Sequence, residues 1–284
     1  MLFRSVDSQA SDSSAAGVPG VGSGSQAIGS SAAGLPGSGS HAVGSRAVGL
    51  PGMGLGLAAV GELAVGATAR QADVLRVAAE AGHGLLAAAL ASIGTELTRR
   101  RGTLAGIVAH GDPALQLAAV ASVLDPTVTV RGPGGTRTMP GEVFFTGRPL
   151  GPADLVTEVV FPGCPAGEGW GFERIAHRST GPQLAGAAAR VALDADGRCR
   201  LVRVAAYTLG HPGGELTAAA AHLIGRRPDA AAIEQAARAA AATVRTRSDA
   251  LTTAEYRGHA VRTLIRRALT RAVHQAQTSV AAGR

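Results

Sequence analysis

Residues 98–107 read TRRRGTLAGI, and residues 110–113 follow as HGDP. The first stretch contains a turn of small residues. In the second, Asp112 followed by Pro113 is typical of a helix start, because a carboxylate caps free amides and proline suits the first helical position. A turn that opens a helix presents backbone amides to anions such as phosphate. The stretch therefore predicts a phosphate-binding turn, and the alternative is a turn that only enters a helix.

The N-terminal tract, residues 1–56, has a different character. It is rich in Gly, Ala, Ser and Pro, and AGVPG at 16–20 recurs as AGLPG at 33–37 and VGLPG at 48–52. Residues this small bury too little apolar surface to offset the entropic cost of ordering the backbone. We expect this tract to be flexible and assign it no fold.

After residue 56 the apolar pattern is that of a globular protein of the α+β class. We expect one partial domain over residues 57–163 and a second domain over residues 164–284, with an antiparallel sheet followed by three helices. The expected helices are 71–80, 85–93, 112–124, 215–224, 229–244 and 253–276. The expected strands are 127–131 and 136–139 in a hairpin, 155–161, 171–177, 184–193 and 199–207. Thr252 and Glu255 match a capping box at the last helix.

Composition narrows the function classes. The formal net charge is +7, but all 27 basic residues are arginine, which looks like nucleotide bias and makes the charge poor evidence about partners. Aromatic residues make up only 3% of the chain, which argues against a surface for single-stranded nucleic acid. Cys164 and Cys199 are too few for an iron–sulfur or zinc site, so we expect free thiols in a reducing compartment. We expect neither an export signal nor a membrane span.

Other motifs predict less. Residues 54–59 fit the dinucleotide pattern GxGxxA with Asp73 beyond, but no strand precedes them and no βαβ order follows. The eight histidines have no metal-ligand spacing, and we assign no catalytic nucleophile. The arginines of the last helix are expected on a solvated or subunit-contacting surface: Arg257, Arg262, Arg266, Arg267 and Arg271.

Several blocks, taken in order, resemble the FAD-binding medium subunit of molybdenum hydroxylases, the family of carbon monoxide dehydrogenase and xanthine dehydrogenase flavoproteins. The family's IGALT, IRNRGTIGGN, Asp-Pro, DFF-x-G and AEYR blocks correspond to VGAT at 65–68, TRRRGTLAGI at 98–107, residues 112–113, VFFTG at 143–147 and AEYR at 254–257. The resemblance extends from about residue 57 to about residue 275. The shared order is more specific than any single block.

This resemblance implies that FAD binds with its diphosphate against two Gly-rich loops. The second loop would consist of Thr103, Leu104, Ala105, Gly106 and Ile107, with Asp112 and Thr68 also beside the cofactor. Ala105 and Ile107 stand where the family has Gly and Asn. The family's first loop, AGGQS, has no clear counterpart, and GSGS at 22–25 is a conceivable substitute.

The resemblance further implies an electron-transfer subunit. Its FAD would accept electrons from iron–sulfur clusters and pass them to an external acceptor. The expected partners are a molybdopterin-binding large subunit and a [2Fe-2S] small subunit in the cytoplasm, and the chain would be inactive alone. One alternative is a degenerate homologue that has lost FAD and keeps the subunit-docking fold. Another is a wrongly assembled N-terminus upstream of a truncated flavoprotein.

Overall fold

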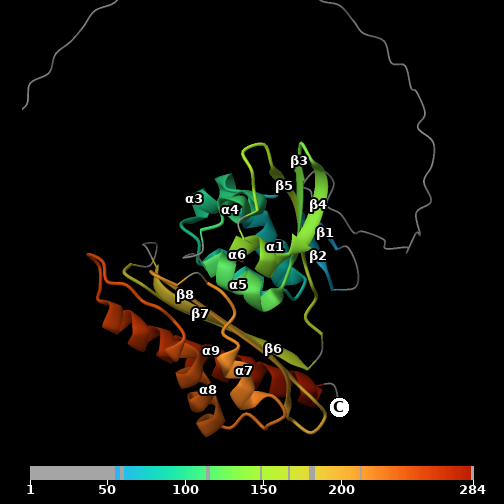
Figure 1. Cartoon of the computed structure of the whole chain (residues 1–284). Coiled ribbons are helices and arrows are strands. Elements are labelled where there is room, and N and C mark those ends of the chain that lie inside the picture. Colours follow the sequence, from blue (N-terminus) through green and yellow to red (C-terminus); the bar gives the residue numbers. More distant parts are fainter. Residues whose placement is uncertain are drawn as a thin grey trace, which may run out of the picture. The chain divides into compact units, whose positions relative to one another are not determined.

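A computed structural model of the chain describes residues 55–57, 61–112, 116–147, 149–165, 167–178, 183–211 and 213–282. The N-terminal tract before residue 55, its expected flexibility and the candidate first loop at 22–25 lie outside these residues. The described residues form a five-stranded and a three-stranded antiparallel sheet, both covered by helices (Figure 1). The α+β class expected from the sequence is confirmed.

The first sheet has the strand order β1-β2-β5-β3-β4, and each neighbouring pair is antiparallel. Its strands are β1 (Leu55–Leu57), β2 (Leu63–Gly66), β3 (Thr127–Gly132), β4 (Gly135–Pro140) and β5 (Leu155–Phe161). The predicted hairpin is confirmed, since β3 pairs with β4 from Thr127↔Pro140 to Gly132↔Gly135. Two valines of β3 and two of β5 are buried in the core, and the threonines beside them are more exposed: Val128, Val130, Val156 and Val159.

Six helices accompany this sheet among the described residues: α1 (Gln71–Glu80), α2 (Gly84–Ala91), α3 (Glu96–Arg101), α4 (Leu104–His110), α5 (Gln116–Leu124) and α6 (Gly141–Gly147). The sequence predicted α1, α2 and the body of α5. It did not predict the short helices α3, α4 and α6. Residues 113–115 lie outside the described residues, so the expected start of α5 at Asp112 stays a prediction.

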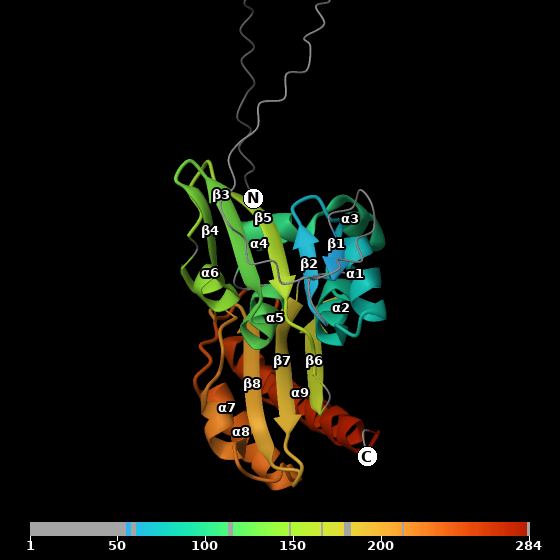
Figure 2. The ribbon, with the colours of Figure 1, turned by 90° about the vertical axis from the view of Figure 1, so that its right-hand side faces the viewer.

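The second sheet consists of β6 (Glu168–Ala176), β7 (Gln183–Leu193) and β8 (Cys199–Thr208) in that order. α5 packs on one face and α9 (Ala254–Ala282) on the other, as Figure 2 shows. Ala188 of β7 joins the core of the first sheet, while its neighbours Ala187 and Ala189 join the core beneath α9. Because both faces are buried, β7 reads as a run of small apolar residues instead of alternating with polar ones.

Two further helices, α7 (Ala218–Leu223) and α8 (Ala230–Ala242), complete this half. α7 is shorter than the predicted 215–224, because Glu215 and Leu216 pair with β8; the Leu216 amide donates to the Val204 carbonyl at 2.7 Å. The predicted capping box is one residue off. Thr253 caps α9, and its hydroxyl accepts a hydrogen bond from the Tyr256 amide at 3.2 Å. The Thr252 amide, which a capping box would pair with Glu255, instead donates to Asp249 Oδ1 at 3.0 Å.

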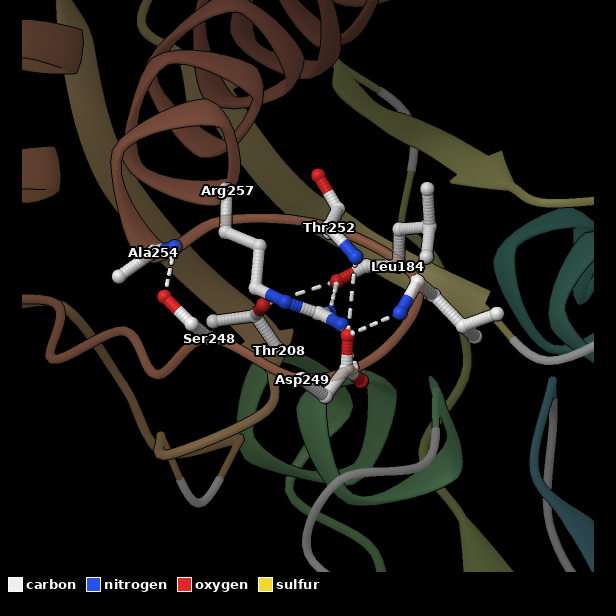
Figure 3. Close-up of polar contacts among 8 residues, drawn as sticks. Leu184, Thr208, Ser248, Asp249, Thr252, Ala254 and Arg257 are labelled. Carbon is white, nitrogen blue, oxygen red and sulfur yellow. Dashed lines mark hydrogen bonds and ion pairs between the residues drawn. The ribbon is translucent and has the colours of Figure 1, made fainter. Parts of the chain in front are cut away.

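Arg257 ties the start of α9 to β7 (Figure 3). Its side chain is only 2% exposed. One guanidinium nitrogen donates to the Leu184 carbonyl at 2.6 Å and another donates to Asp249 Oδ2 at 2.6 Å. The expectation of a solvated or subunit-contacting arginine is therefore wrong for Arg257. Its guanidinium is buried because it donates hydrogen bonds to a carbonyl of β7 and to a carboxylate in the loop before α9.

Two glycines of β6 allow α9 to approach the sheet closely. A Cβ on Gly171 would collide with the carbonyl oxygen of Ala268, and one on Gly169 with that of Ala272. Backbone atoms cannot rotate away, so we expect Gly171→Ala to lower the free energy of unfolding by about 2–3 kcal/mol. Urea denaturation measures this. Gly134→Ala is the matched control, since a methyl there meets nothing within 4 Å. Equal losses in the two variants would contradict the prediction.

Candidate functional site

The Thr103 turn joins two helices. α3 ends at Arg101, Gly102 is extended, and Thr103 is the N-cap of α4. The Thr103 hydroxyl accepts a hydrogen bond from the Gly106 amide at 3.0 Å. The predicted turn of small residues is thus the N-terminus of a short helix, where the first amides lack the usual helical partner and the helix dipole favours negative charge.

Residues 68–71 lie directly beside this turn. Arg70 and Thr103 form an antiparallel bridge, in which the Leu104 amide donates to the Ala69 carbonyl at 3.1 Å. Thr68 is exposed in the tight turn just before Ala69, whose amide donates to the Gly66 carbonyl at 3.2 Å. The structure therefore places the residues that directly follow Thr68 against the Thr103 turn, although the two segments are more than 30 positions apart in the chain.

Most amides of the turn are already engaged inside the protein. The Leu104 amide binds Ala69, the Gly106 amide binds the Thr103 hydroxyl, and the Ile107 amide donates to the Thr103 carbonyl at 3.3 Å. Within the described part of the chain, the Ala105 amide has no acceptor. Of the several amides expected to bind an anion, only the Ala105 amide is left without an acceptor among the described residues. It lies next to the exposed residue Gly106.

The side chains of the turn point largely into the core. Leu104 is fully buried, Ala105 is 4% exposed, and Ile107 is half-buried against the same apolar cluster. The methyl group that distinguishes Ala105 from glycine therefore lies on the protein side of the turn. Gly106 is exposed, and Thr103 and Ile107 are partly exposed, so the Ala105 methyl does not cover the exposed side of the turn.

Asp112 lies at the other end of α4. Gly111 ends the helix in the left-handed conformation, with φ of 59°, and Asp112 follows it. A helix of 7 residues separates Asp112 from Thr103, which corresponds to roughly 10 Å. A hollow of about 130 Å³ opens at this end, lined by Ala109, Gly111, Phe144 and Leu150. One group cannot contact Thr103 and Asp112 at once unless it is long.

The sequence did not single out Gln71, which the structure places against the turn. Its side chain is 5% exposed, and its Nε2 donates to the Thr103 carbonyl at 3.2 Å. Its Oε1 is buried without a partner among the described residues. The only available signal was a polar residue at the first position of an amphipathic helix, and that position is usually solvated.

The thiols show no sign of nucleophilic or metal chemistry. Burial raises the pKa of Cys199 to about 11 and also raises the pKa of Cys164, so both are protonated near neutral pH. Among the described residues, no cluster of three or more His, Cys, Asp or Glu side chains suits a metal ion. No helix in the same part of the chain has the length and apolarity needed to cross a membrane.

Two domain families match this chain. Residues 56–164 match the family described as FAD binding domain in molybdopterin dehydrogenase, and residues 174–272 match the CO dehydrogenase flavoprotein C-terminal domain. A curated relative, the 6-hydroxypseudooxynicotine dehydrogenase complex subunit alpha of Paenarthrobacter nicotinovorans, is 29% identical over 157 residues, which are 54% of this chain and 53% of the relative. The chain thus spans about half the length of that relative.

Solved structures share the fold. The carbon monoxide dehydrogenase from Hydrogenophaga pseudoflava, in a form lacking the Mo-pyranopterin moiety, superposes with a TM-score of 0.69 at 28% identity, over 75% of each chain. Quinoline 2-oxidoreductase from Pseudomonas putida 86 superposes with a TM-score of 0.69 at 26% identity, over 76% of each chain. The Thr103 turn and the AEYR segment fall inside the two matched domains.

Proposed function

The chain belongs to the FAD-binding flavoprotein subunits of molybdenum hydroxylase-type dehydrogenases, and we propose that it passes electrons from iron–sulfur clusters to an external acceptor. The membership expected from the ordered motifs is confirmed. The matched FAD-binding domain indicates FAD as the cofactor of this oxidoreductase subunit. The observation that supports the proposal is the position of the Thr103 turn inside that domain. An antiparallel bridge between Arg70 and Thr103 holds it beside the turn that contains Thr68.

The chemistry of the turn fits a diphosphate. Among the described residues the Ala105 amide is a donor without an acceptor, and Gly106 is exposed and has no side chain. These groups lie at the positive end of a helix, which favours an anion. The residues present therefore match what a nucleotide diphosphate needs, with fewer free amides than a Gly-Gly loop offers.

We assign the site residues the following roles. Thr103 caps α4 and fixes its first turn, while Leu104 and Ile107 anchor that turn in the core. Ala105 and Gly106 contact the diphosphate through their backbone. Thr68 lies beside them, and Asp112 contacts another part of the long cofactor from the far end of α4. When bound, FAD supplies the redox chemistry, and the protein supplies its position.

The partners follow from the chemistry of the proposed electron path. An iron–sulfur cluster needs four ligands, usually cysteines, and the whole sequence has two. We therefore place the clusters on a [2Fe-2S] small subunit and the substrate on a molybdopterin-binding large subunit. The curated relative is likewise named as a subunit of a complex. On this proposal the chain works in the cytoplasm and is inactive alone.

Reconstitution with FAD tests the cofactor. We expect the purified full chain, incubated with FAD and separated from free flavin, to retain about one FAD per chain, measured as flavin absorbance. A folded protein, verified by circular dichroism, that retains no flavin would overturn the proposed electron-transfer role. In that case, capture of the two partner subunits by the flavin-free protein would support the degenerate docking homologue instead.

A further inference from the structure

We propose that Gln71 is a positioning residue that holds the Thr103 turn in place for the diphosphate of FAD. The proposal rests on the proposed function and adds a residue that lies outside the Gly-containing turn itself. Gln71 is the first residue of α1, so it belongs to a different segment of the chain from the turn that it contacts.

Gln71 binds two consecutive carbonyls of the turn. Its backbone amide donates to the Gly102 carbonyl at 2.9 Å, and its side-chain Nε2 donates to the Thr103 carbonyl at 3.2 Å. These two carbonyls lie on either side of the Thr103 main chain, immediately before the helix begins. A residue that holds both fixes the direction in which α4 starts, and hence the direction of the Ala105 amide.

Gly102 leaves space for the Gln71 side chain because it has no Cβ. Its backbone is in an ordinary extended conformation, with φ of −72° and ψ of 146°, so glycine is not required there for its torsion angles. A Cβ at Gly102 would instead lie 2.8 Å from Nε2 of Gln71. The glycine before Thr103 therefore makes room for the Gln71 side chain, which links a motif residue to a residue that no motif contains.

The remaining polar atom of Gln71 also suits a nucleotide. Its Oε1 is buried and has no partner among the described residues, which is unfavourable in a protein interior. An amide oxygen accepts a hydrogen bond from a hydroxyl, the donor that a nucleotide ribose carries. The same side chain thus orders the turn with its nitrogen and offers an acceptor with its oxygen.

The first experiment measures affinity in the full chain. Gln71→Met keeps the size of the side chain and removes both polar atoms. We expect the dissociation constants of FAD and of ADP to rise about 10-fold, measured by flavin fluorescence quenching and by calorimetry. Gln275→Met is the matched control, because it removes a hydrogen bond of 3.1 Å from the Trp170 amide in the other half of the chain. The control should keep its affinity for both ligands.

A double-mutant cycle separates positioning from general stability. Gly102→Ala alone should weaken FAD binding, because its methyl collides with Gln71. In the Gln71→Ala background the nearest neighbour left to this methyl is the Thr98 carbonyl oxygen at 3.3 Å, so the second substitution should cost less than it does alone. Unchanged affinity in Gln71→Met, or strictly additive losses in the cycle, would overturn the positioning role while leaving FAD binding intact. A wild-type chain that binds neither FAD nor ADP would instead overturn the proposed function.

Discussion

Arg257→Ala is expected to lower the free energy of unfolding by about 3–4 kcal/mol. The substitution removes a buried guanidinium that holds the Leu184 carbonyl and the Asp249 carboxylate, both at 2.6 Å. The Leu184 carbonyl keeps one donor, the Thr208 hydroxyl at 2.8 Å, while Asp249 loses its only ion pair among the described residues. The cavity left by the side chain adds to the loss.

Thermal unfolding measures this effect. A loss of that size corresponds to a fall in Tm of about 6–12 °C for a chain of this length. Arg262→Ala is the matched control on the same helix, because Arg262 is 42% exposed and pairs with Glu234 at the surface. Surface ion pairs contribute little to stability, so the control should unfold close to wild type. Similar Tm values for the two variants would contradict the buried role of Arg257.

The ion pair between Arg257 and Asp249 predicts that stability depends on pH. The hydrogen bond from Arg257 lowers the pKa of Asp249 below its ordinary value of 3.8, and the backbone amides of Thr252 and Leu251 act in the same direction. The stability that this carboxylate contributes is present above that value and is lost as the pH falls through the lowered pKa. We therefore expect the difference in stability between wild type and Arg257→Ala to shrink when denaturation is repeated below pH 3.8.

Gly106→Asp is expected to weaken FAD binding on the order of 100-fold. The substitution puts a carboxylate on the exposed side of the α4 start, where the diphosphate is proposed to lie. Two like charges about 5 Å apart at a protein surface repel each other by about 3 kcal/mol, which corresponds to this loss of affinity. A Cβ at Gly106 also lies 2.7 Å from the Thr103 hydroxyl, so the cap must shift.

Flavin titration of three variants separates charge from size. Gly106→Asn has nearly the shape of the aspartate without its charge, and we expect it to lose only a small part of the affinity. Gly134→Asp introduces the same charge in the β3–β4 turn and should bind FAD like wild type. Equal affinity of Gly106→Asp and Gly106→Asn would show that no anion binds beside Gly106, and the proposed diphosphate site would then be wrong.

The local patterns of the sequence were enough to predict much of the fold. The β3–β4 hairpin, α1 and α8 follow from alternation, turn residues and helical spacing, which all act within about ten positions. The short helices α3, α4 and α6 were missed because helices of six or seven residues are unstable alone and depend on packing. Glu215 and Leu216 were assigned to a helix because no local signal reveals that β8 lies beside them.

The sequence by itself determined the family, the α+β order and the position of the Gly-containing turn, because these depend on residue types in a fixed linear order. Only the tertiary structure decided which amides of that turn are free, that Gln71 holds it, and that Arg257 is buried. Each of these depends on contacts between distant segments: the bond from Gln71 to Thr103 spans 32 positions and the bond from Arg257 to Leu184 spans 73. The acceptor in each bond is a backbone carbonyl, a group that every residue carries, so which carbonyl is bound is set by how the chain packs and not by local sequence.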